Sequence, residues 1–398
     1  MKKKIVLLGA MQMHLPLIER AHERGIDVVT VDWTKENPGH SLASAAYFDS
    51  TTDAEAVERI VCREKADGVL TFNSDPAALT AAVVAERLNL PGSGSRAVEI
   101  MSEKDKFRQF LSDNGFNVTR FGSYSDFESL SRDLERYQLP VMIKPVDSSG
   151  SKGVVRVNSF DDLKTAFDVA LKLSRGGRVI IEEFIEAAGP QLHGDGFVAE
   201  GELQFLSLGD HHFDSSINNL VPVSTTFPSV HTQSEIKAVE EEVRRFIRAV
   251  GFRQGGINVE ARISARDGKP YLIETGARNG GNFTPIIIGK ATGFDFIDAA
   301  LDAALGLPFR PQNVKAPEPT AYLIMHSPKE GVLSDISLSP RLKSLLFDRF
   351  DYLKPGDEVK TFKGANMAIG VLLVSFPDVA TMLEIADGME REITITLK

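Results

Sequence analysis

Predominantly apolar runs alternate with amphipathic runs over the first hundred residues. The apolar runs at residues 4–8, 27–31 and 67–72 predict strands, and the amphipathic runs at 14–24 and 76–88 predict helices. Strands of this kind separated by helices are typical of a parallel sheet covered on both faces. Such a unit can bind a dinucleotide, with Asp32 holding a ribose, but the turn after the first strand lacks the second and third glycines. The pattern therefore favours an α/β domain without a nicotinamide site.

From about residue 98 the pattern changes to short helices and local hairpins. Helices are predicted at 101–114, 126–137 and 161–173, and strands at 116–121, 139–144, 154–157 and 179–185. This mixture is typical of an α+β fold. Beyond a proline-rich stretch at 309–319, strands are predicted at 320–326, 367–376 and 392–397, and helices at 340–346 and 378–388. We therefore predict three domains, at 1–98, 99–312 and 316–398.

Composition narrows the class of protein. The chain has 398 residues, a net charge of −10 and no block of Lys and Arg, which disfavours nucleic-acid and anionic-membrane partners. Its single cysteine, Cys62, excludes an internal disulfide and fits a reducing cytoplasm. The apolar run after the N-terminal lysines is too short for a signal sequence, and no run of eighteen apolar residues occurs. We expect a cytoplasmic protein.

A loop of small residues is the most informative segment of the chain. It lies within residues 141–157 (VMIKPVDSSGSKGVVRV), between a strand that ends in Lys144 and a second strand rich in Val. Serines and glycines let backbone N–H groups crowd around an anion, and Lys144 can place a charge beside the same group. The chain contains no Walker A motif, so this would be a different kind of phosphate site. A plain hairpin turn has the same composition and stays an equal alternative.

Residues 255–283 form a second constellation, in which two alternating runs flank an Asp-Gly turn. A three-residue loop at 266–268 pairs Ala265 with Lys269 and places Glu260 directly opposite Glu274. Two carboxylates roughly 5 Å apart on one sheet face need a cation between them, and hard oxygen ligands favour Mg²⁺. A two-residue turn would instead shift the register by one and put the glutamates on opposite faces.

Three further side chains belong to this hairpin. Asn258 and Arg262 share the face of Glu260, and Arg278 follows the second strand. Asn258 can add a neutral oxygen ligand, and an arginine can clamp a phosphoryl group during transfer. The alternative is a solvated hairpin whose glutamates pair with Arg262 and Arg278.

Together these residues resemble those of the ATP-grasp superfamily, over most of the chain. The resemblance implies a Rossmann-like first domain, α+β nucleotide-gripping subdomains and a small C-terminal domain. It assigns Lys104 and Lys144 as the two nucleotide lysines, and Glu182-Glu183-Phe184-Ile185 as the hinge that holds the adenine. It assigns the lid to Ser148, Ser149, Gly150, Ser151, Lys152 and Gly153, the metal ligands to Glu260 and Glu274, and the phosphate arginine to Arg278.

The chain departs from the family pattern at two positions. Gln191 stands at the ribose-binding position, where many relatives carry Glu, so hydrogen bonding survives but charge does not. The second metal strand usually ends Glu-x-Asn, and here Gly276 replaces the Asn. One ligand is thus missing unless Asn258, Asn279 or Asn282 supplies the oxygen, which puts the second Mg²⁺ in doubt and leaves ATP binding intact.

The resemblance implies an ATP-dependent carboxylate–amine ligase, similar to carbamoyl-phosphate-synthetase-like and amino-acid-ligase-like members. It would form an amide through an acyl-phosphate and release ADP and phosphate, with ATP and Mg²⁺, or Mn²⁺, as cofactors. Its partners would be a small carboxylic acid and an amine, with a homodimer left open. Lys144, Arg278 and Arg262 would bear the catalytic role. A bicarbonate-activating carboxylase and a non-catalytic ATP-binding protein remain alternatives.

Two minor features concern substrate binding. His211 and His212 are adjacent, and on a strand they would point to opposite faces, which disfavours a joint metal site. We assign their loop a substrate role, with a solvated turn as the alternative. The loop at 73–75 follows a parallel strand, where it either faces the acceptor or caps the next helix. His193 and Asp195 are expected to line the nucleotide cleft or to cap a turn.

Overall fold

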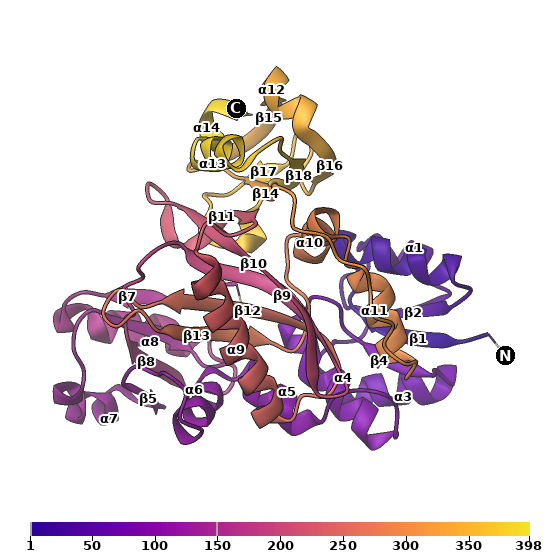
Figure 1. Cartoon of the computed structure of the whole chain (residues 1–398), viewed down its shortest axis with the longest axis horizontal. Helices are drawn as coiled ribbons and strands as arrows, with labels where there is room; N and C mark the ends of the chain where they lie inside the picture. The colour runs from indigo at the N-terminus through magenta and orange to yellow at the C-terminus, as the bar shows by residue number, and fades with distance from the viewer. Residues whose placement is uncertain (1, 149) are drawn as a thin grey trace.

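The first hundred residues form a parallel sheet at one end of the molecule (Figure 1). The computed structural model describes residues 2–148 and 150–398, so the predicted lid residue Ser149 lies outside the described residues. The strand order is β3-β2-β1-β4, and every pairing in this sheet is parallel, as predicted. The strands are β1 (Lys4–Leu8), β2 (Asp27–Val31), β3 (Ala45–Tyr47) and β4 (Gly68–Leu70). The helices are α1 (Leu15–Glu23), α2 (Gly39–Leu42), α3 (Ala54–Glu64) and α4 (Asp75–Arg87).

The helix predicted at 101–114 is present, but it begins three residues later than predicted, and a second helix that was not predicted precedes it. They are α5 (Ser95–Ser102) and α6 (Lys104–Asp113). Glu103 between them has extended backbone angles, φ −104° and ψ 117°. Its carboxylate accepts from Arg178 at 2.8 Å, and the break places Lys104 at the first position of α6. The break between α5 and α6 thus coincides with an ion pair between Glu103 and Arg178. The local hydrophobic pattern does not reveal this break.

A four-stranded antiparallel sheet carries the predicted lid loop. The strand order is β5-β8-β6-β7, from β5 (Phe121–Tyr124), β6 (Val141–Pro145), β7 (Val155–Val157) and β8 (Val179–Glu183). Helices α7 (Phe127–Arg132) and α8 (Leu163–Leu173) pack on it. The strand predicted at 116–121 is wrong: Phe116 is apolar because it packs against Phe246 of another helix. Lys144 and Glu182 come from the neighbouring strands β6 and β8.

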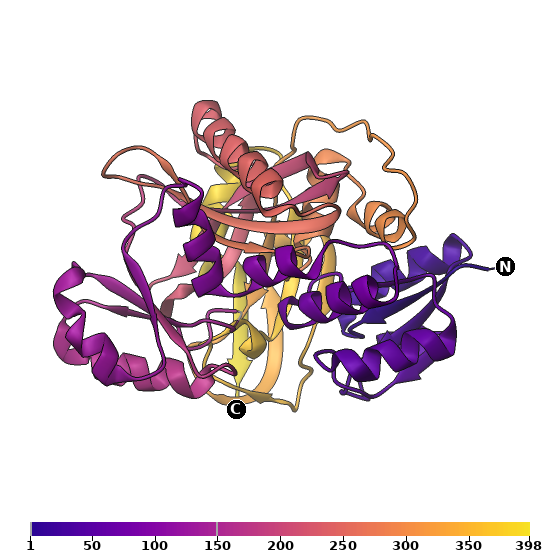
Figure 2. The ribbon, with the colours of Figure 1, turned by 90° about the horizontal axis from the view of Figure 1, so that it is seen from below.

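The largest sheet has eight strands and extends through the centre of the molecule (Figures 1 and 2). In spatial order they are β13 (Pro270–Gly276), β12 (Gly255–Ile263), β9 (Gln191–Ala199), β10 (Glu202–Asp214), β11 (Asn218–Phe227), β14 (Thr320–Met325), β18 (Gly370–Ser375) and β16 (Leu346–Asp351). The predicted boundary at 312–316 is a linker in sequence, yet β11 pairs with β14 across it. Hydrogen bonding therefore joins the middle of the chain to its C-terminal part.

One face of this sheet is buried beneath α9 (Gln233–Val250). A reciprocal capping box between Thr232 and Glu235 starts this helix, and Gly251 ends it with φ 74°. Its apolar stripe, with Phe246 at its centre, packs on Ile257 and Val259 of β12. Residues at the alternate positions of β12 therefore point to the opposite face. This second face carries most of the predicted site.

The remaining elements complete the C-terminal part, which forms the top of the molecule in Figure 1. They are β15 (Gly331–Leu338), α12 (Pro340–Leu345), β17 (Glu358–Val359), α13 (Val379–Asp387), α14 (Met389–Glu392) and β19 (Ile393–Leu397). Helices α10 (Thr284–Thr292) and α11 (Phe296–Ala304) lie below this part in Figure 1, and α11 contacts α1 of the N-terminal domain. Short 3₁₀ turns occur at Gln12–His14, Leu134–Arg136, Phe160–Asp162 and Ala365–Met367. The predicted strands and helices here are present to within a few residues, and β15, β16, β17 and α14 are additions. Within the described residues, no helix combines the length and apolarity needed to cross a membrane.

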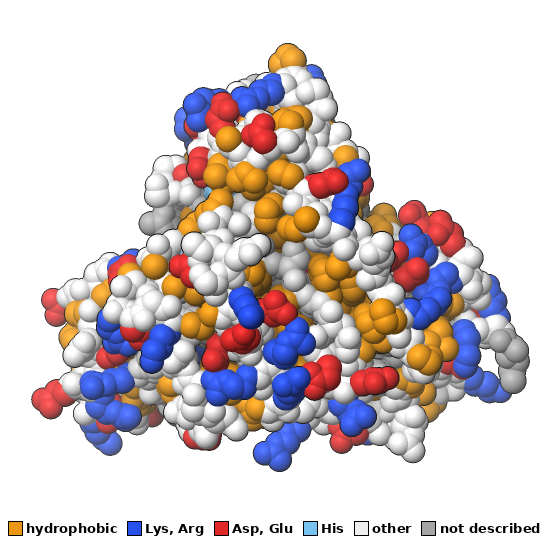
Figure 3. Space-filling view, viewed as in Figure 1, with side chains coloured by type: hydrophobic (Ala, Val, Ile, Leu, Met, Phe, Trp, Pro, Cys, Tyr) orange, Lys and Arg blue, Asp and Glu red, His pale blue; other side chains and the backbone are white. Residues whose placement is uncertain are grey.

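Basic and acidic side chains are intermingled on the face of the molecule seen in Figure 3. They gather mainly over its lower half, whereas apolar side chains are more frequent around the base of the C-terminal part. Mixed signs over this face agree with the sequence, in which Lys and Arg do not cluster.

Candidate active site

The polar face of the large sheet is built by alternation along two adjacent strands, β9 and β12. Gln191, His193 and Asp195 occupy every second position of β9. Asn258, Glu260 and Arg262 do the same on β12. Glu260 is the cross-strand partner of His193 on one side. Glu260 therefore lies beside His193 of β9 on one side and beside Glu274 of β13, the other predicted metal ligand, on the other side.

Glu260 and Glu274 are directly opposite each other, as the sequence predicts. The turn is nevertheless one residue longer than predicted, because the Ser264 N–H bonds to the Lys269 carbonyl at 2.9 Å. Such a turn would misalign the glutamates by one position. A register shift between Glu260 and Ala261 restores the pairing and leaves Ile273 as an extra residue in β13.

The bulged segment of β13 has a partner of its own. The Arg108 guanidinium donates to the carbonyl of Ile273 at 2.6 Å and to that of Leu272 at 3.2 Å. Both carbonyl groups belong to the bulge, where regular pairing with β12 is interrupted. The bonds from Arg108 therefore satisfy their need for a donor. Arg108 therefore supports the register that makes Glu260 face Glu274.

Gln191 links Glu260 to Arg262. Its amide nitrogen donates to Glu260 at 2.8 Å, and its amide oxygen accepts two bonds from Arg262 at 2.7 and 2.9 Å. Arg262 also donates to the carbonyl of Ile185 at 2.9 Å, and its guanidinium lies 4.7 Å from the centre of the Phe184 ring. Arg262 is therefore grouped with the hinge residues.

Lys144, Glu182 and Arg108 form a buried ion triad. Lys144 and Glu182 are 8% and 5% exposed, and their charged groups are in direct contact. Arg108 donates to the other carboxylate oxygen of Glu182 at 2.7 Å. Burial raises the pKa of Glu182, but the charges of Arg108 and Lys144 outweigh it and lower that pKa to about 2. Burial lowers the pKa of Lys144 against the attraction of Glu182.

Lys104 contacts both the predicted lid loop and Glu274, one of the two predicted metal ligands. The Lys104 ammonium donates to the carbonyl of Ser148 at 2.7 Å and lies 3.5 Å from a Glu274 oxygen. Gly150, Ser151 and Gly153 have positive φ values of 66°, 58° and 72°, so the loop turns sharply.

The far end of the lid contacts the large sheet. The Ser151 hydroxyl donates to the carbonyl of Leu220 in β11 at 2.7 Å. The Ser148 hydroxyl donates to the Lys152 carbonyl at 2.9 Å, and the Lys152 side chain is exposed. The loop therefore spans the gap between the small sheet and the large one.

The predicted hinge residues lie at the end of β8. Glu183 differs from its buried neighbour Glu182, because its carboxylate accepts from the backbone N–H of Gln138 at 2.9 Å. Two guanidinium groups lie over the Phe184 ring, that of Arg156 at 4.0 Å and that of Arg262 at 4.7 Å from its centre. Cations stacked on an aromatic ring hold this segment in place.

Arg278 joins the large sheet to the N-terminal domain. It forms two parallel bonds to Asp75, at 2.7 and 2.5 Å, across 203 residues of sequence. The neighbouring Asn279 N–H bonds to the carbonyl of Phe72 at 2.9 Å. The loop at 73–75 thus both starts α4 and faces the site. The Asn73 amide oxygen in this loop is buried without a hydrogen-bond partner among the described residues.

Asp195 anchors the segment that follows β13. Its carboxylate accepts two bonds from the Gly280 N–H, at 2.9 and 2.8 Å, and one from the Asn258 amide at 2.8 Å. Burial raises the pKa of Asp195 to about 6, although these hydrogen bonds oppose the rise. Because the Asn258 amide nitrogen donates to Asp195 within the sheet, the plane of the Asn258 amide group is fixed beside Glu260.

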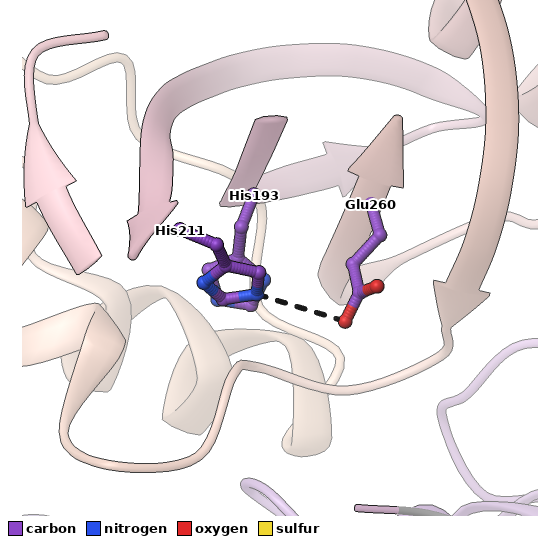
Figure 4. A group of neighbouring side chains, drawn as sticks. All are labelled: His193, His211 and Glu260. Atoms are coloured by element: carbon purple, nitrogen blue, oxygen red, sulfur yellow. Dashed lines mark ion pairs between the residues drawn. The ribbon is translucent and has the colours of Figure 1, made fainter. Parts of the chain in front are cut away.

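The two adjacent histidines lie on β10 and not in a loop, which corrects the sequence interpretation. They do point to opposite faces, as predicted. His212 pairs with Asp387 at 2.8 Å, whereas His211 stacks on His193 with ring centres 4.2 Å apart. Figure 4 shows the stacked rings facing Glu260.

Sequence reasoning missed Arg108 and the tertiary role of His211. Arg108 lies four residues after Lys104, on the same face of α6, and that spacing is the one local signal for it. Nothing in the sequence pairs His211 with His193, because the register of β9 and β10 brings them together.

Comparison with known proteins places these features in a family. Residues 137–286 match the model of the ATP-grasp domain family. The chain is 24% identical over 372 residues to a carbamoyl phosphate synthase large chain of Thermoanaerobacter pseudethanolicus, covering 88% of this chain and 34% of the relative. It is 30% identical over 191 residues to a formate-dependent phosphoribosylglycinamide formyltransferase of Burkholderia lata, covering 46% of each. The chain thus spans about a third of the synthase chains that it matches.

Solved structures share the whole fold. An L-amino acid ligase from Bacillus licheniformis superposes with a TM-score of 0.85 at 24% identity, covering 100% of this chain and 99% of that one. A phosphoribosylglycinamide synthetase from Anaerococcus prevotii superposes with a TM-score of 0.79 at 23% identity, covering both chains fully. These likenesses confirm the predicted combination of a parallel α/β domain with α+β subdomains. Residues 137–286 are thus similar to the ATP-grasp domain family, within a chain whose whole fold is shared with these solved structures.

Proposed function

We propose that this protein is an ATP-dependent carboxylate–amine ligase, which forms an amide through an acyl-phosphate and releases ADP and phosphate. The observation that carries the proposal is the facing pair Glu260 and Glu274, joined through Lys104 to the lid. A structural hairpin gains nothing from two opposed carboxylates, whereas a phosphoryl-transfer site needs them to hold a divalent cation.

The residues fit the cofactors Mg²⁺ and ATP. Glu260 and Glu274 are 28% and 35% exposed at their side chains, so an ion can reach both. Two carboxylates are the hard oxygen donors that Mg²⁺ or Mn²⁺ prefers, and Asn258 lies two residues before Glu260 on β12. The lid residues Ser148 and Gly150 to Gly153, together with Lys104, would bind phosphates, and the hinge at 182–185 with Gln191 would bind adenine and ribose.

The chain's own groups would act mainly by positioning and charge. Bound Mg·ATP would supply the phosphoryl group. Lys144 and Arg278 would neutralise negative charge that develops on its oxygens, while the lid would exclude water. Both cations have carboxylate partners in this structure, Glu182 and Asp75. Each would therefore be held in a fixed place before the substrates bind, which reduces the reorganisation needed for transfer.

The atoms of the overall reaction balance as follows. A carboxylate oxygen of the acid forms a bond to the γ-phosphorus, and the bond from that phosphorus to the ADP oxygen breaks. The nitrogen of the amine then bonds to the acyl carbon, loses a proton, and phosphate leaves. A small carboxylic acid and an amine are the proposed substrates.

A bicarbonate-activating carboxylase is the second candidate. One observation favours keeping it: N5-carboxyaminoimidazole ribonucleotide synthetase from Thermotoga maritima shares this fold with a TM-score of 0.77 at 17% identity. That likeness concerns the fold alone. The two candidates differ in the substrate that triggers ATP cleavage.

The test is release of ADP and phosphate from Mg·ATP against a panel of carboxylic acids, amino acids, amines and bicarbonate. Release that requires one acid and one amine, with a condensed product mass, would support the ligase. Release with bicarbonate in place of an organic acid would support the carboxylase instead. Tight ATP binding without release on the whole panel would contradict both enzymes and indicate a non-catalytic ATP-binding protein.

A matched pair of variants ties the activity to the site. Glu274→Ala removes one of the facing carboxylates and is expected to lower ADP release by at least about 100-fold. Glu128→Ala is the control, because Glu128 is 79% exposed on α7, a helix that packs on the four-stranded antiparallel sheet. Full activity in Glu274→Ala would contradict the assignment of the metal ligands.

A further inference from the structure

Two imidazoles and a carboxylate converge on the polar face of the large sheet (Figure 4). His193 and His211 are each 6% exposed, and their rings stack at an interplanar angle of 22°. One ligand atom from each histidine and from Glu260 lies within 4.8 Å of the other two. The three side chains come from β9, β10 and β12, so the sheet register holds them together.

The hydrogen-bond network assigns the tautomer of His211. The Thr225 hydroxyl donates to the Tyr322 oxygen at 2.6 Å, and the Thr225 oxygen lies 2.7 Å from His211 Nδ1. Because the single hydroxyl proton is used on Tyr322, Nδ1 must carry the proton that Thr225 accepts. The lone pair of His211 is then on Nε2, which faces a Glu260 oxygen at 3.8 Å. A cation between these two electron-rich atoms would bind both.

His193 adds a second electron donor. His193 Nδ1 is buried without a hydrogen-bond partner among the described residues, and its Nε2 has only the Asn258 amide at 3.5 Å. A buried polar atom left unpaired is costly, and an ion bound at Nδ1 would remove that cost.

We propose that His193, His211 and Glu260 bind a transition-metal ion of the Zn²⁺ class, at a site separate in donor chemistry from the Glu260–Glu274 pair. Imidazole nitrogen is a ligand of Zn²⁺ and Co²⁺, whereas Mg²⁺ takes oxygen. Bond lengths near 2.0–2.2 Å would place two ligands of one ion roughly 3.3 Å apart, so the ligand atoms, which lie within 4.8 Å of one another, need to close by up to about 1.5 Å. The hydrogen bond from His211 to Thr225 fixes that ring in the orientation such a ligand requires.

Because the proposed Zn²⁺ site and the Glu260–Glu274 pair share Glu260, binding of one ion affects binding of the other. This consequence rests on the proposed function. An ion held by the two histidines would take the carboxylate that Mg²⁺ needs. Zn²⁺ and Mg·ATP would therefore exclude each other, and Zn²⁺ would inhibit the ligase in competition with Mg·ATP. Gln191, which donates to Glu260 at 2.8 Å, would be displaced from that oxygen or shift with it.

The binding arm of the test uses Co²⁺ as a visible-absorption probe on the full chain without nucleotide. The wild-type protein is expected to bind one equivalent with a ligand-field band that stoichiometric Zn²⁺ removes. His211→Asn and His193→Gln should weaken binding at least about tenfold, since even partners behind a ligand contribute that much. His212→Ala is the control, because this neighbour points to the opposite face and pairs with Asp387. Far-UV circular dichroism of each variant checks folding.

The outcomes separate the site from the proposed activity. A Co²⁺ band of equal strength in both site variants, or a band lost in His212→Ala, would overturn the site. In the kinetic arm, Zn²⁺ should raise the KM for Mg·ATP in the wild type by more than in His193→Gln. Equal Zn²⁺ inhibition in the two proteins would overturn the competition through Glu260. If no substrate panel gives ADP release, the proposed function fails while the Co²⁺ result still decides the site.

Discussion

Removal of the charge on Glu182 is expected to destabilise the protein strongly. Glu182 is 5% exposed and neutralises Lys144 and Arg108, so Glu182→Gln would leave two buried cations with a neutral partner. The pKa of Glu182 is lowered from 4.5 to about 2, and a displacement of that size corresponds to about 3 kcal/mol of folding free energy. Breaking a buried ion pair typically costs about 3–5 kcal/mol, which agrees in size.

The pH dependence has a definite sign. Because the folded pKa of Glu182 lies below the unfolded value, its contribution is fully present above about pH 4.5 and is lost as the pH falls toward about 2. The cost of Glu182→Gln should therefore fall from about 3 kcal/mol at pH 7 to about 2 kcal/mol at pH 3.5. Neutral pH is where the carboxylate contributes most.

Urea unfolding followed by far-UV circular dichroism measures both values. Glu186→Gln is the control, because Glu186 is 64% exposed and its ion pair with Arg156 should be worth less than about 1 kcal/mol. A cost for Glu182→Gln below about 1 kcal/mol at pH 7 would refute the reasoning. An equal cost at both pH values would show that the charge of Glu182 is not what stabilises the fold.

Three further outcomes follow from the same geometry. Lys144→Ala is expected to lower ADP release at least about 100-fold with an unchanged circular dichroism spectrum, and retained activity would remove Lys144 from the site. Gly194→Ala should destabilise the fold by more than about 3 kcal/mol in urea unfolding, since the added Cβ would lie 1.9 Å from the Ser207 carbonyl oxygen, whereas Gly94→Ala has open space and should be nearly neutral. Chelation with EDTA should stop ADP release and excess Mg²⁺ should restore it, and turnover that persists in EDTA would contradict the need for a divalent ion.

The sequence predicted the elements whose signals are local. Alternation along β12 and β13 predicted the facing glutamates because side chains on a strand repeat every two residues. The first two strands, β1 and β2, were predicted to the residue because continuous apolar runs are bounded by polar residues and glycines. Each of these signals lies within about ten residues of the element it defines.

One correct prediction rested on an incorrect detail. The turn between β12 and β13 is longer than predicted, and the bulge at Ile273 cancels the difference. The bulge is held by Arg108, which comes from a helix far away in the sequence. Local turn chemistry could not have revealed it, because the stabilising donor is not local.

Contacts between distant segments were decided by the tertiary structure. Glu182 meets Arg108 across 74 residues, and Arg278 meets Asp75 across 203. His193 and His211 meet because β9 pairs with β10 in one register. By itself the sequence determined which residues have the right chemistry and which strand face they occupy, since both follow from side-chain type and a two-residue period. The partner of each charge depended on how helices and sheets pack, and no periodicity along the chain encodes that.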